Sequence, residues 1–182
     1  MMRYRFGTLS VLFLFSLIGC QPSGRALVSG MSAPTWNACF SPHGHCTELV
    51  VDTLASAKQT VFVQAYSFTS APIAQALIDA SKRGVHVRVI LDKSQRTEHY
   101  SAADVLLHAG IPVNIDAAHA IAHNKVMVID GDTVITGSFN FTKAAEEHNA
   151  ENLLVLHDRA LAAEYATNWQ NHQAHSEPYE GR

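Results

Sequence analysis

The stretch HNKVMVIDGDTVITGSFN, residues 123–140, decides how the chain is organised. Two polar residues, His123 and Lys125, stand at the start of an apolar run that is typical of a buried strand. Because residues i and i+2 of a strand point to the same face, the imidazole and the ammonium are presented side by side. Ser138 and Asn140 add a hydroxyl and a carboxamide at the end of a second predicted strand. A nucleophile or base, a fixed cation and neutral hydrogen-bond donors are the groups that an anionic phosphoryl centre requires.

Helical and strand periodicities alternate along the rest of the chain. They predict helices over 46–57, 72–83, 100–109 and 159–172, strands over 60–66, 85–91, 112–115, 125–129, 133–136 and 151–156, and a short helix or turn over 142–148. This order indicates an α/β layer architecture with a mixed sheet. Residues 21–37 are rich in Ser, Gly, Pro and Ala and are interpreted as a tether. The domain is expected over 38–173, followed by a frayed tail over 174–182.

The charge of the chain argues against a protein that grips nucleic acid by net charge alone. The 182 residues carry 13 basic and 16 acidic side chains, for a formal charge of −3. Removal of the first 19 residues, which hold two arginines and no acid, leaves 11 basic and 16 acidic side chains, or −5. Strong electrostatic binding to phosphate backbones requires the opposite sign. A local basic cleft is still compatible with this composition.

The first 20 residues are expected to be a targeting segment. Arg3 and Arg5 precede an apolar run over 6–18, which is short for a transmembrane helix. The run ends in LIGC, which resembles the lipobox of bacterial lipoproteins, and Cys20 would then be lipidated. By the same resemblance, Gln21 at the next position favours the outer membrane. The protein is therefore expected to be exported, to the periplasm or the outer membrane; an ordinary signal peptide with an incidental Cys20 is the alternative.

The two other cysteines, Cys39 and Cys46, lie close together in the sequence. An exported chain meets an oxidising compartment, which favours a disulfide between them. His43 and His45 lie between the two and raise zinc as an alternative. Adjacent ligands at 45 and 46 fit one tetrahedral ion poorly, so the disulfide is preferred.

The pattern His123-x-Lys125-x4-Asp130, followed by Gly137-Ser138-x-Asn140, resembles the phospholipase D superfamily. More narrowly, it is similar to the small bacterial Nuc-type endonucleases. The resemblance implies an αβα sandwich with a mixed, mostly parallel central β-sheet. It also implies phosphodiester hydrolysis through a phosphohistidine, without a metal or another cofactor. Larger members carry two copies of the motif and this chain carries one, so a homodimer with a shared site is expected.

The resemblance assigns roles to individual residues. His123 would be the nucleophile, and its counterpart in a second subunit the general acid. Lys125, Asn140 and Ser138 would hold the phosphate oxygens. Glu151 matches the family's carboxylate that orients the histidine, as the acid of a Ser-His-Asp triad does. Asp130 lies seven residues beyond His123, too far along the strand to touch the same phosphate, and is interpreted as structural.

Substrate contacts are expected from loops at the strand ends. Lys93 and Arg96 could follow a phosphate backbone, Phe68 could stack on a base, and His119 lies in a neighbouring loop. Ordinary solvated loops and a core aromatic are the alternative. The expected activity is non-specific cleavage of DNA, with RNA as a further substrate. A phospholipase D acting on lipid headgroup esters and a non-catalytic surface lipoprotein are the competing functions.

Overall fold

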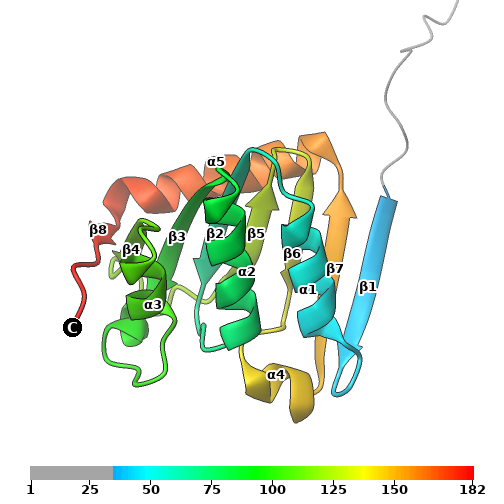
Figure 1. Cartoon of the computed structure of the whole chain (residues 1–182), viewed down its shortest axis with the longest axis horizontal. Coiled ribbons are helices and arrows are strands. Elements are labelled where there is room, and N and C mark those ends of the chain that lie inside the picture. The colour runs from blue at the N-terminus through cyan, green and yellow to red at the C-terminus, as the bar shows by residue number, and fades with distance from the viewer. Residues whose placement is uncertain (1–34) are drawn as a thin grey trace, which may run out of the picture. The chain divides into compact units, whose positions relative to one another are not determined.

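The computed structural model describes residues 35–182, so the predicted signal peptide, Cys20 and most of the predicted tether lie outside the described residues. Figure 1 shows how the elements are arranged. The strands are β1 (Thr35–Ser41), β2 (Thr60–Ala65), β3 (His86–Asp92), β4 (Val113–Asp116), β5 (Lys125–Ile129), β6 (Thr133–Gly137), β7 (Glu151–His157) and β8 (Glu177–Pro178). The helices are α1 (Cys46–Ala55), α2 (Ala71–Lys82), the 3-10 helix η1 (Lys93–Arg96), α3 (Ala103–His108), α4 (Lys143–Glu147) and α5 (Arg159–His175). Within residues 35–182, none of these helices has the length and apolar character that crossing a membrane would demand.

The strands form one mixed sheet in the order β1-β7-β6-β5-β2-β3-β4-β8. The expected α/β class is confirmed, but the expectation of a mostly parallel sheet is wrong. In the described residues, only the pairings β2–β3 and β3–β4 are parallel, and the other five are antiparallel. Parallel pairs need a crossover helix, which α2 and α3 provide. The later strands are joined by a tight turn and by a short segment with α4, and such connections favour antiparallel neighbours.

Helices cover both faces of the sheet and complete the αβα sandwich. In Figure 1, α1, α2 and α3 lie in front of the strands, and α5 passes behind them. The larger core lies on the α1–α2 side, where Leu54, Leu77 and Ile73 are fully buried. A smaller cluster on the α5 side includes Val128 and Val134.

Trp169 fixes α5 against the sheet. Its side chain is 2% exposed, and its indole Nε1 donates a hydrogen bond of 2.9 Å to the backbone oxygen of Val63. The indole ring stacks on Phe62 with centroids 4.6 Å apart, and the Arg88 guanidinium lies 5.5 Å from the indole ring. A buried indole that also satisfies a strand carbonyl gives α5 a defined position on β2.

The turn between β5 and β6 shows what Asp130 does. Asp130 and Gly131 both have positive φ, 52° and 67°, as a tight hairpin turn requires. The Asp130 carboxylate accepts hydrogen bonds from the backbone N–H groups of Lys58, Gln59 and Thr60, at 2.9, 2.8 and 2.9 Å. The motif aspartate therefore ties the start of β2 to the end of β5, and its partners are backbone amides rather than a cation.

The folded part of the chain is longer at both ends than the expected 38–173. β1 begins at Thr35 and pairs along its whole length with β7, as far as Ser41 opposite Glu151. After α5, β8 pairs with β4, and Tyr179 is 6% exposed with its hydroxyl donating to Asp104 at 2.8 Å. The tail is thus packed rather than frayed, because its aromatic ring finds a place beside α3.

A disulfide joins Cys39 of β1 to Cys46 at the start of α1, with the two Cα atoms 5.5 Å apart. Because both sulfur atoms belong to the disulfide, neither cysteine can bind zinc as a thiolate, as the alternative site would require.

Candidate active site

The residues expected to carry the chemistry lie at one end of the central strands β2, β5, β6 and β7. We call this end of the strands the motif edge. β2 ends there, opposite the start of β5, with Ala65 paired to Lys125. β6 ends there too, at Gly137, paired to Leu153 near the start of β7. Gly137 has a φ of 149°, and a Cβ at this position would lie 2.2 Å from the backbone oxygen of Asn152. Only glycine allows this approach, which sets the direction of the residues that follow.

Lys125 is a buried cation beside an exposed imidazole. The lysine is 6% exposed, and its Nζ donates a hydrogen bond of 2.9 Å to the backbone oxygen of His123. The same Nζ lies 5.0 Å from the centre of the Tyr66 ring. The His123 ring, which is exposed, lies 4.7 Å from the Tyr66 ring. The Tyr66 ring therefore packs against both the imidazole and the ammonium and keeps them close together.

The pKa of Lys125 is lowered from its ordinary value. Burial of the ammonium is the main cause, and the negative charge of Glu151 opposes it. The negative charge of Glu151 favours the charged form of the lysine and so partly offsets the burial. A desolvated cation with two of its three donor hydrogens left for a ligand is suited to binding phosphate oxygens.

Glu151 and Ser138 form a second pair at this edge. The Ser138 hydroxyl donates a hydrogen bond of 2.5 Å to Glu151 Oε2, and the Asn149 amide donates one of 3.1 Å to Oε1. The expected hydrogen bond between Glu151 and His123 is not present in the described residues. Both carboxylate oxygens are used at the β6–β7 end, so within one copy of the chain Glu151 orients Ser138 rather than the imidazole.

Asn140 brings an unpaired polar atom to the site. Its Oδ1 is buried without a hydrogen-bond partner in the described part of the chain. Buried polar atoms are almost always hydrogen-bonded, and exceptions occur at functional sites. The residue stands two positions after Ser138, in the segment that follows the end of β6.

The expected substrate contacts need correction. Phe68 is fully buried and packs edge-on against Phe141 with centroids 5.8 Å apart, so it belongs to the core and cannot stack on a base. Arg96 forms an ion pair of 2.6 Å with Glu177, which compensates its charge. Lys93 remains exposed, although its Nζ donates to the backbone oxygen of His119 at 2.9 Å.

His119 Nδ1 lies 3.1 Å from the carboxylate of Asp116, and the side chain is 45% exposed, so its contact with substrate stays a prediction. Two further residues support the site, and the motif gave neither of them a role there. Tyr66 is one, and its position follows from the strand register. Asp92 is the other: it is 3% exposed, and it accepts a hydrogen bond of 2.7 Å from the backbone N–H of Ala122, just before the nucleophile position.

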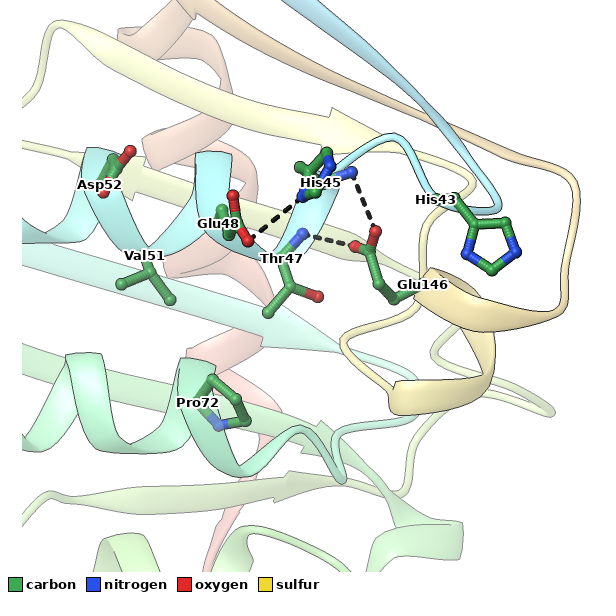
Figure 2. A pocket seen from close by; sticks show the side chains of 8 residues that line it. All are labelled: His43, His45, Thr47, Glu48, Val51, Asp52, Pro72 and Glu146. Atoms are coloured by element: carbon green, nitrogen blue, oxygen red, sulfur yellow. Dashed lines mark hydrogen bonds and ion pairs between the residues drawn. The ribbon is translucent and has the colours of Figure 1, made fainter.

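A separate depression of about 500 Å³ lies on the helical face and is lined by residues of α1, α2 and α4 (Figure 2). Glu146 accepts hydrogen bonds there from the backbone N–H groups of His45 and Thr47, at 3.0 and 2.7 Å. This carboxylate satisfies the first N–H groups of α1, which is a structural role. None of the candidate catalytic residues lines the depression.

The fold, together with the residues at the motif edge, is that of an enzyme that hydrolyses phosphodiesters. Residues 50–173 match the family described as "Cardiolipin synthase, PLD-like domain". The chain belongs to this phospholipase D-like family, and it is a phosphodiesterase of the phospholipase D superfamily.

Individual relatives agree with this assignment. The chain is 43% identical to a protein named phospholipase D from Rickettsia conorii over 147 residues, 81% of this chain and 74% of that protein. Its structure is similar to that of Nuc from Salmonella typhimurium, a phospholipase D family member, with a TM-score of 0.78 and 39% identity over 81% of this chain and 99% of that one. NucT from Helicobacter pylori shares the fold, with a TM-score of 0.74 and 24% identity over 81% of this chain and 100% of that one.

Proposed function

We propose that the protein is an endonuclease that cleaves DNA, and RNA as a further substrate, without sequence preference and without a catalytic metal. The observation that carries this proposal is the exposure of His123 just before the start of the central strand β5. A nucleophile placed there can reach a phosphodiester within a long polymer lying across the surface. The similarity to Nuc, which extends over 99% of that chain, supports the same choice.

The proposed reaction has two displacements. An imidazole nitrogen of His123 attacks phosphorus, so that a P–N bond forms while the P–O bond to the leaving group breaks. His123 of the partner subunit gives its proton to the leaving oxygen. That imidazole then takes a proton from water, whose oxygen attacks phosphorus and breaks the P–N bond. The first histidine is thereby regenerated.

Three groups are proposed to bind the phosphate oxygens during both steps. Lys125 offers a buried positive charge, and Asn140 offers a neutral amide. Ser138 donates to Glu151 in this structure, and it can accept or donate a hydrogen bond at the same edge. Charge that develops on the oxygens of a five-coordinate phosphorus is stabilised most by donors that are already in place.

The proposed assembly is a homodimer with one site made by both copies. One chain supplies one His-x-Lys pair, and the two displacements need two imidazoles with opposite protonation states. Light scattering of the purified protein should give twice the chain mass. A fully active species with the mass of one chain would contradict the shared site.

The proposed location is outside the cytoplasm, with the chain anchored through lipid on Cys20. This rests on the sequence of the first 20 residues alone. Mass spectrometry of the mature N-terminus should find a diacylated cysteine, and Cys20→Ala should release the protein from membrane fractions. An unmodified Cys20 would leave an ordinary signal peptide as the better explanation.

A phospholipase D acting on headgroup esters is the second candidate. The Rickettsia conorii relative carries that name, and Ile121, two residues before His123, is 56% exposed. An exposed apolar side chain close in sequence to the nucleophile is compatible with a lipid surface.

A substrate panel separates the two candidates. The purified protein is incubated with plasmid DNA, single-stranded DNA, RNA, and phosphatidylcholine or cardiolipin vesicles, each with and without EDTA, at 25 °C. We expect nucleic acid to be cut in both conditions. His123→Ala should lower the rate by at least about 1,000-fold, whereas His108→Ala, an exposed change on α3, should leave it unaltered. Hydrolysis of the lipids alone would refute the nuclease proposal.

A further inference from the structure

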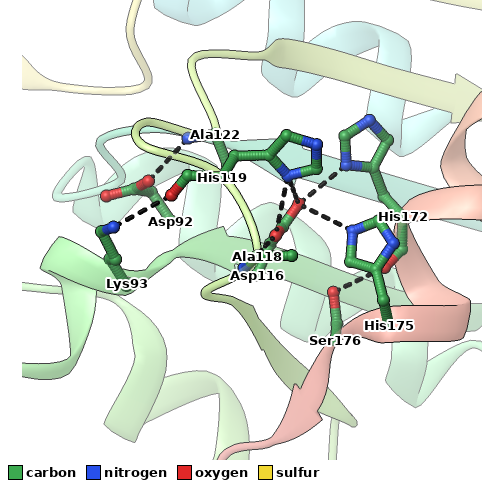
Figure 3. Close-up of polar contacts among 9 residues, drawn as sticks. All are labelled: Asp92, Lys93, Asp116, Ala118, His119, Ala122, His172, His175 and Ser176. Carbon is green, nitrogen blue, oxygen red and sulfur yellow. Dashed lines mark hydrogen bonds and ion pairs between the residues drawn. The ribbon is translucent and has the colours of Figure 1, made fainter.

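Three histidines and one aspartate converge where the end of β4 meets the end of α5 (Figure 3). Asp116 ends β4, His119 follows it in the loop that leads to β5, and His172 and His175 occupy the last turn of α5. One nitrogen or oxygen atom from each residue lies within 4.8 Å of those from the other three. These residues are outside the motif edge and have no part in the proposed reaction.

One nitrogen of each of the three imidazole rings is directed at the carboxylate of Asp116. Asp116 is fully buried, and its Oδ2 lies 2.7 Å from His172 Nδ1, 3.1 Å from His119 Nδ1 and 3.4 Å from His175 Nε2. The three imidazole centroids are 4.9, 5.2 and 5.3 Å apart. In Figure 3 the three rings surround the carboxylate, and each directs a nitrogen at it.

Hydrogen bonding alone explains this arrangement poorly. One imidazole donor is enough to fix a buried carboxylate, and three imidazoles this close repel one another whenever more than one is protonated. His172 and His175 are spaced i, i+3, so they project from the same face of α5. With neutral imidazoles, the four side chains together offer one lone pair each to a single dication, since one ligand atom of each lies within 4.8 Å of the other three.

We propose that Asp116, His119, His172 and His175 bind one zinc ion in a closed, four-ligand site. Three imidazole nitrogens and one carboxylate oxygen are a ligand set that zinc accepts in tetrahedral geometry. With bonds of about 2.0–2.2 Å, neighbouring ligand atoms of a tetrahedral site lie about 3.3 Å apart. The present separations, which run from 2.7 Å to at most 4.8 Å, lie on both sides of this value.

The backbone around the ligands is already held in place. His119 accepts a hydrogen bond from Lys93 Nζ at 2.9 Å through its backbone oxygen, and Asp116 Oδ1 accepts from the backbone N–H of Ala118 at 3.1 Å. The Ser176 hydroxyl donates 2.7 Å to the backbone oxygen of His172. Such fixed surroundings reduce the cost of ordering the ligands around the ion. Access is open, because the side chains of His119 and His175 are 45% and 39% exposed.

The zinc ion has a structural consequence for the nucleophile. His119 stands four residues before His123, and the loop between them is otherwise held by Asp92, which binds the backbone N–H of Ala122. An ion at the cluster joins this loop to α5 through metal–ligand bonds. Because all four positions are taken by protein ligands, the ion has no open position for water or substrate and does not take part in the chemistry. The hydrolysis of phosphodiesters in EDTA at 25 °C is therefore still expected.

The test measures metal binding directly. The full chain is purified without a histidine tag, stripped with a chelator and titrated with Zn²⁺ in competition with a chromogenic chelator, and Co²⁺ is used to record the visible spectrum. We expect one Zn²⁺ per chain with a Kd below about 1 µM, an intense tetrahedral Co²⁺ spectrum, and a rise in Tm on adding Zn²⁺.

Two ligand variants and two controls make the result decisive. His175→Ala removes the most weakly engaged ligand, and His172→Gln keeps an amide that can donate to Asp116 but is a poor zinc ligand. Each should weaken Zn²⁺ binding by at least about 100-fold and abolish the rise in Tm. His108→Ala and His123→Ala should bind Zn²⁺ as the unaltered protein does. Absence of stoichiometric binding by the unaltered protein, or undiminished binding by either ligand variant, would refute the site.

Discussion

Asp130→Asn should lower stability and leave the catalytic rate unaltered, although Asp130 belongs to the motif that contains His123 and Lys125. The carboxylate accepts hydrogen bonds from the N–H groups of three successive residues, 58–60, with N–O distances of 2.8 to 2.9 Å. At about 3.3 Å per strand residue, Asp130 lies roughly 16 Å from Lys125 along β5. The substitution therefore acts on the junction between β2 and β5 and not on the motif edge.

The magnitude follows from which hydrogen bonds survive. Oδ1 accepts from Gln59 and Thr60, and an asparagine oxygen can replace it. Oδ2 accepts from Lys58, where the asparagine would present an amide donor to another donor. Hydrogen bonds to a charged group are worth about 1.5–3 kcal/mol each, and partial exposure places these at the lower end. We expect a loss of about 2 kcal/mol for asparagine and about 4 kcal/mol for alanine, the asparagine loss corresponding to a fall in Tm of about 4–8 °C.

The effect should depend on pH in one direction. Burial raises the pKa of Asp130, but the N–H groups of Thr60, Gln59 and Lys58 outweigh it, so the pKa of the folded state lies below the ordinary value. The stabilisation is therefore complete above the pKa of the unfolded state, about 3.9, and is lost as the pH falls through the lower pKa of the folded state. The stability difference between Asp130 and its asparagine variant should shrink over that range.

Urea unfolding at pH 7 and at several values down to pH 3 measures this difference, and the rate of DNA cleavage is measured at 25 °C. Asp52→Asn, the same change at an exposed position of α1, is the control and should alter stability by less than about 0.5 kcal/mol. If Asp130→Asn lowered kcat/KM tenfold or more while the free energy of unfolding stayed the same, the structural role would be wrong.

Three further predictions concern the motif edge and the core. Burial lowers the pKa of Lys125 and Glu151 opposes this, so Glu151→Gln should move the alkaline limb of the pH–rate profile to lower pH; an unmoved limb would count against a catalytic Lys125. Gly137→Ala places a Cβ 2.2 Å from the backbone oxygen of Asn152 and should cost about 2–4 kcal/mol, measured as a fall in Tm. Trp169→Phe leaves a buried strand carbonyl without its 2.9 Å donor and should cost about 2 kcal/mol by urea unfolding; a loss below about 0.5 kcal/mol would contradict the anchoring of α5.

Most helices and strands could be predicted because the residue patterns that indicate each of them lie within the element or at its ends. A continuous apolar run predicted β5, and the Asp-Gly-Asp segment after it predicted the turn into β6. Ser70 and Pro72 at the start of α2, with Gly84 after its end, gave helix limits within two residues of those observed. The pairing of the strands was harder to predict, because it joins residues that are far apart in the sequence. Thr35 pairs with His157, so the segment that begins there is a strand, although its composition suggested a tether.

Side-chain environments were predicted less well for the same reason. Phe68 was expected at the substrate surface, but it is buried against Phe141, seventy-three residues later in the sequence. The ligands of the proposed zinc site are also far apart, since Asp116 meets His172 and His175 only when α5 crosses the sheet. No motif of closely spaced residues in the sequence predicts such a cluster. His123 and Lys125, by contrast, are only two residues apart in the sequence, where β5 begins, so sequence alone could place them together.

The disulfide between Cys39 and Cys46 determines how a mechanical load on the start of β1 is distributed. Pulling at Thr35 first stretches the ladder between β1 and β7 from its end at His157. If that ladder opens, the tension passes at Cys39 through a covalent bond into α1. The last pair of the ladder, Ser41 with Glu151, lies beyond this point. The end of β7 that carries Glu151 is thus shielded from traction at the N-terminal side of the domain.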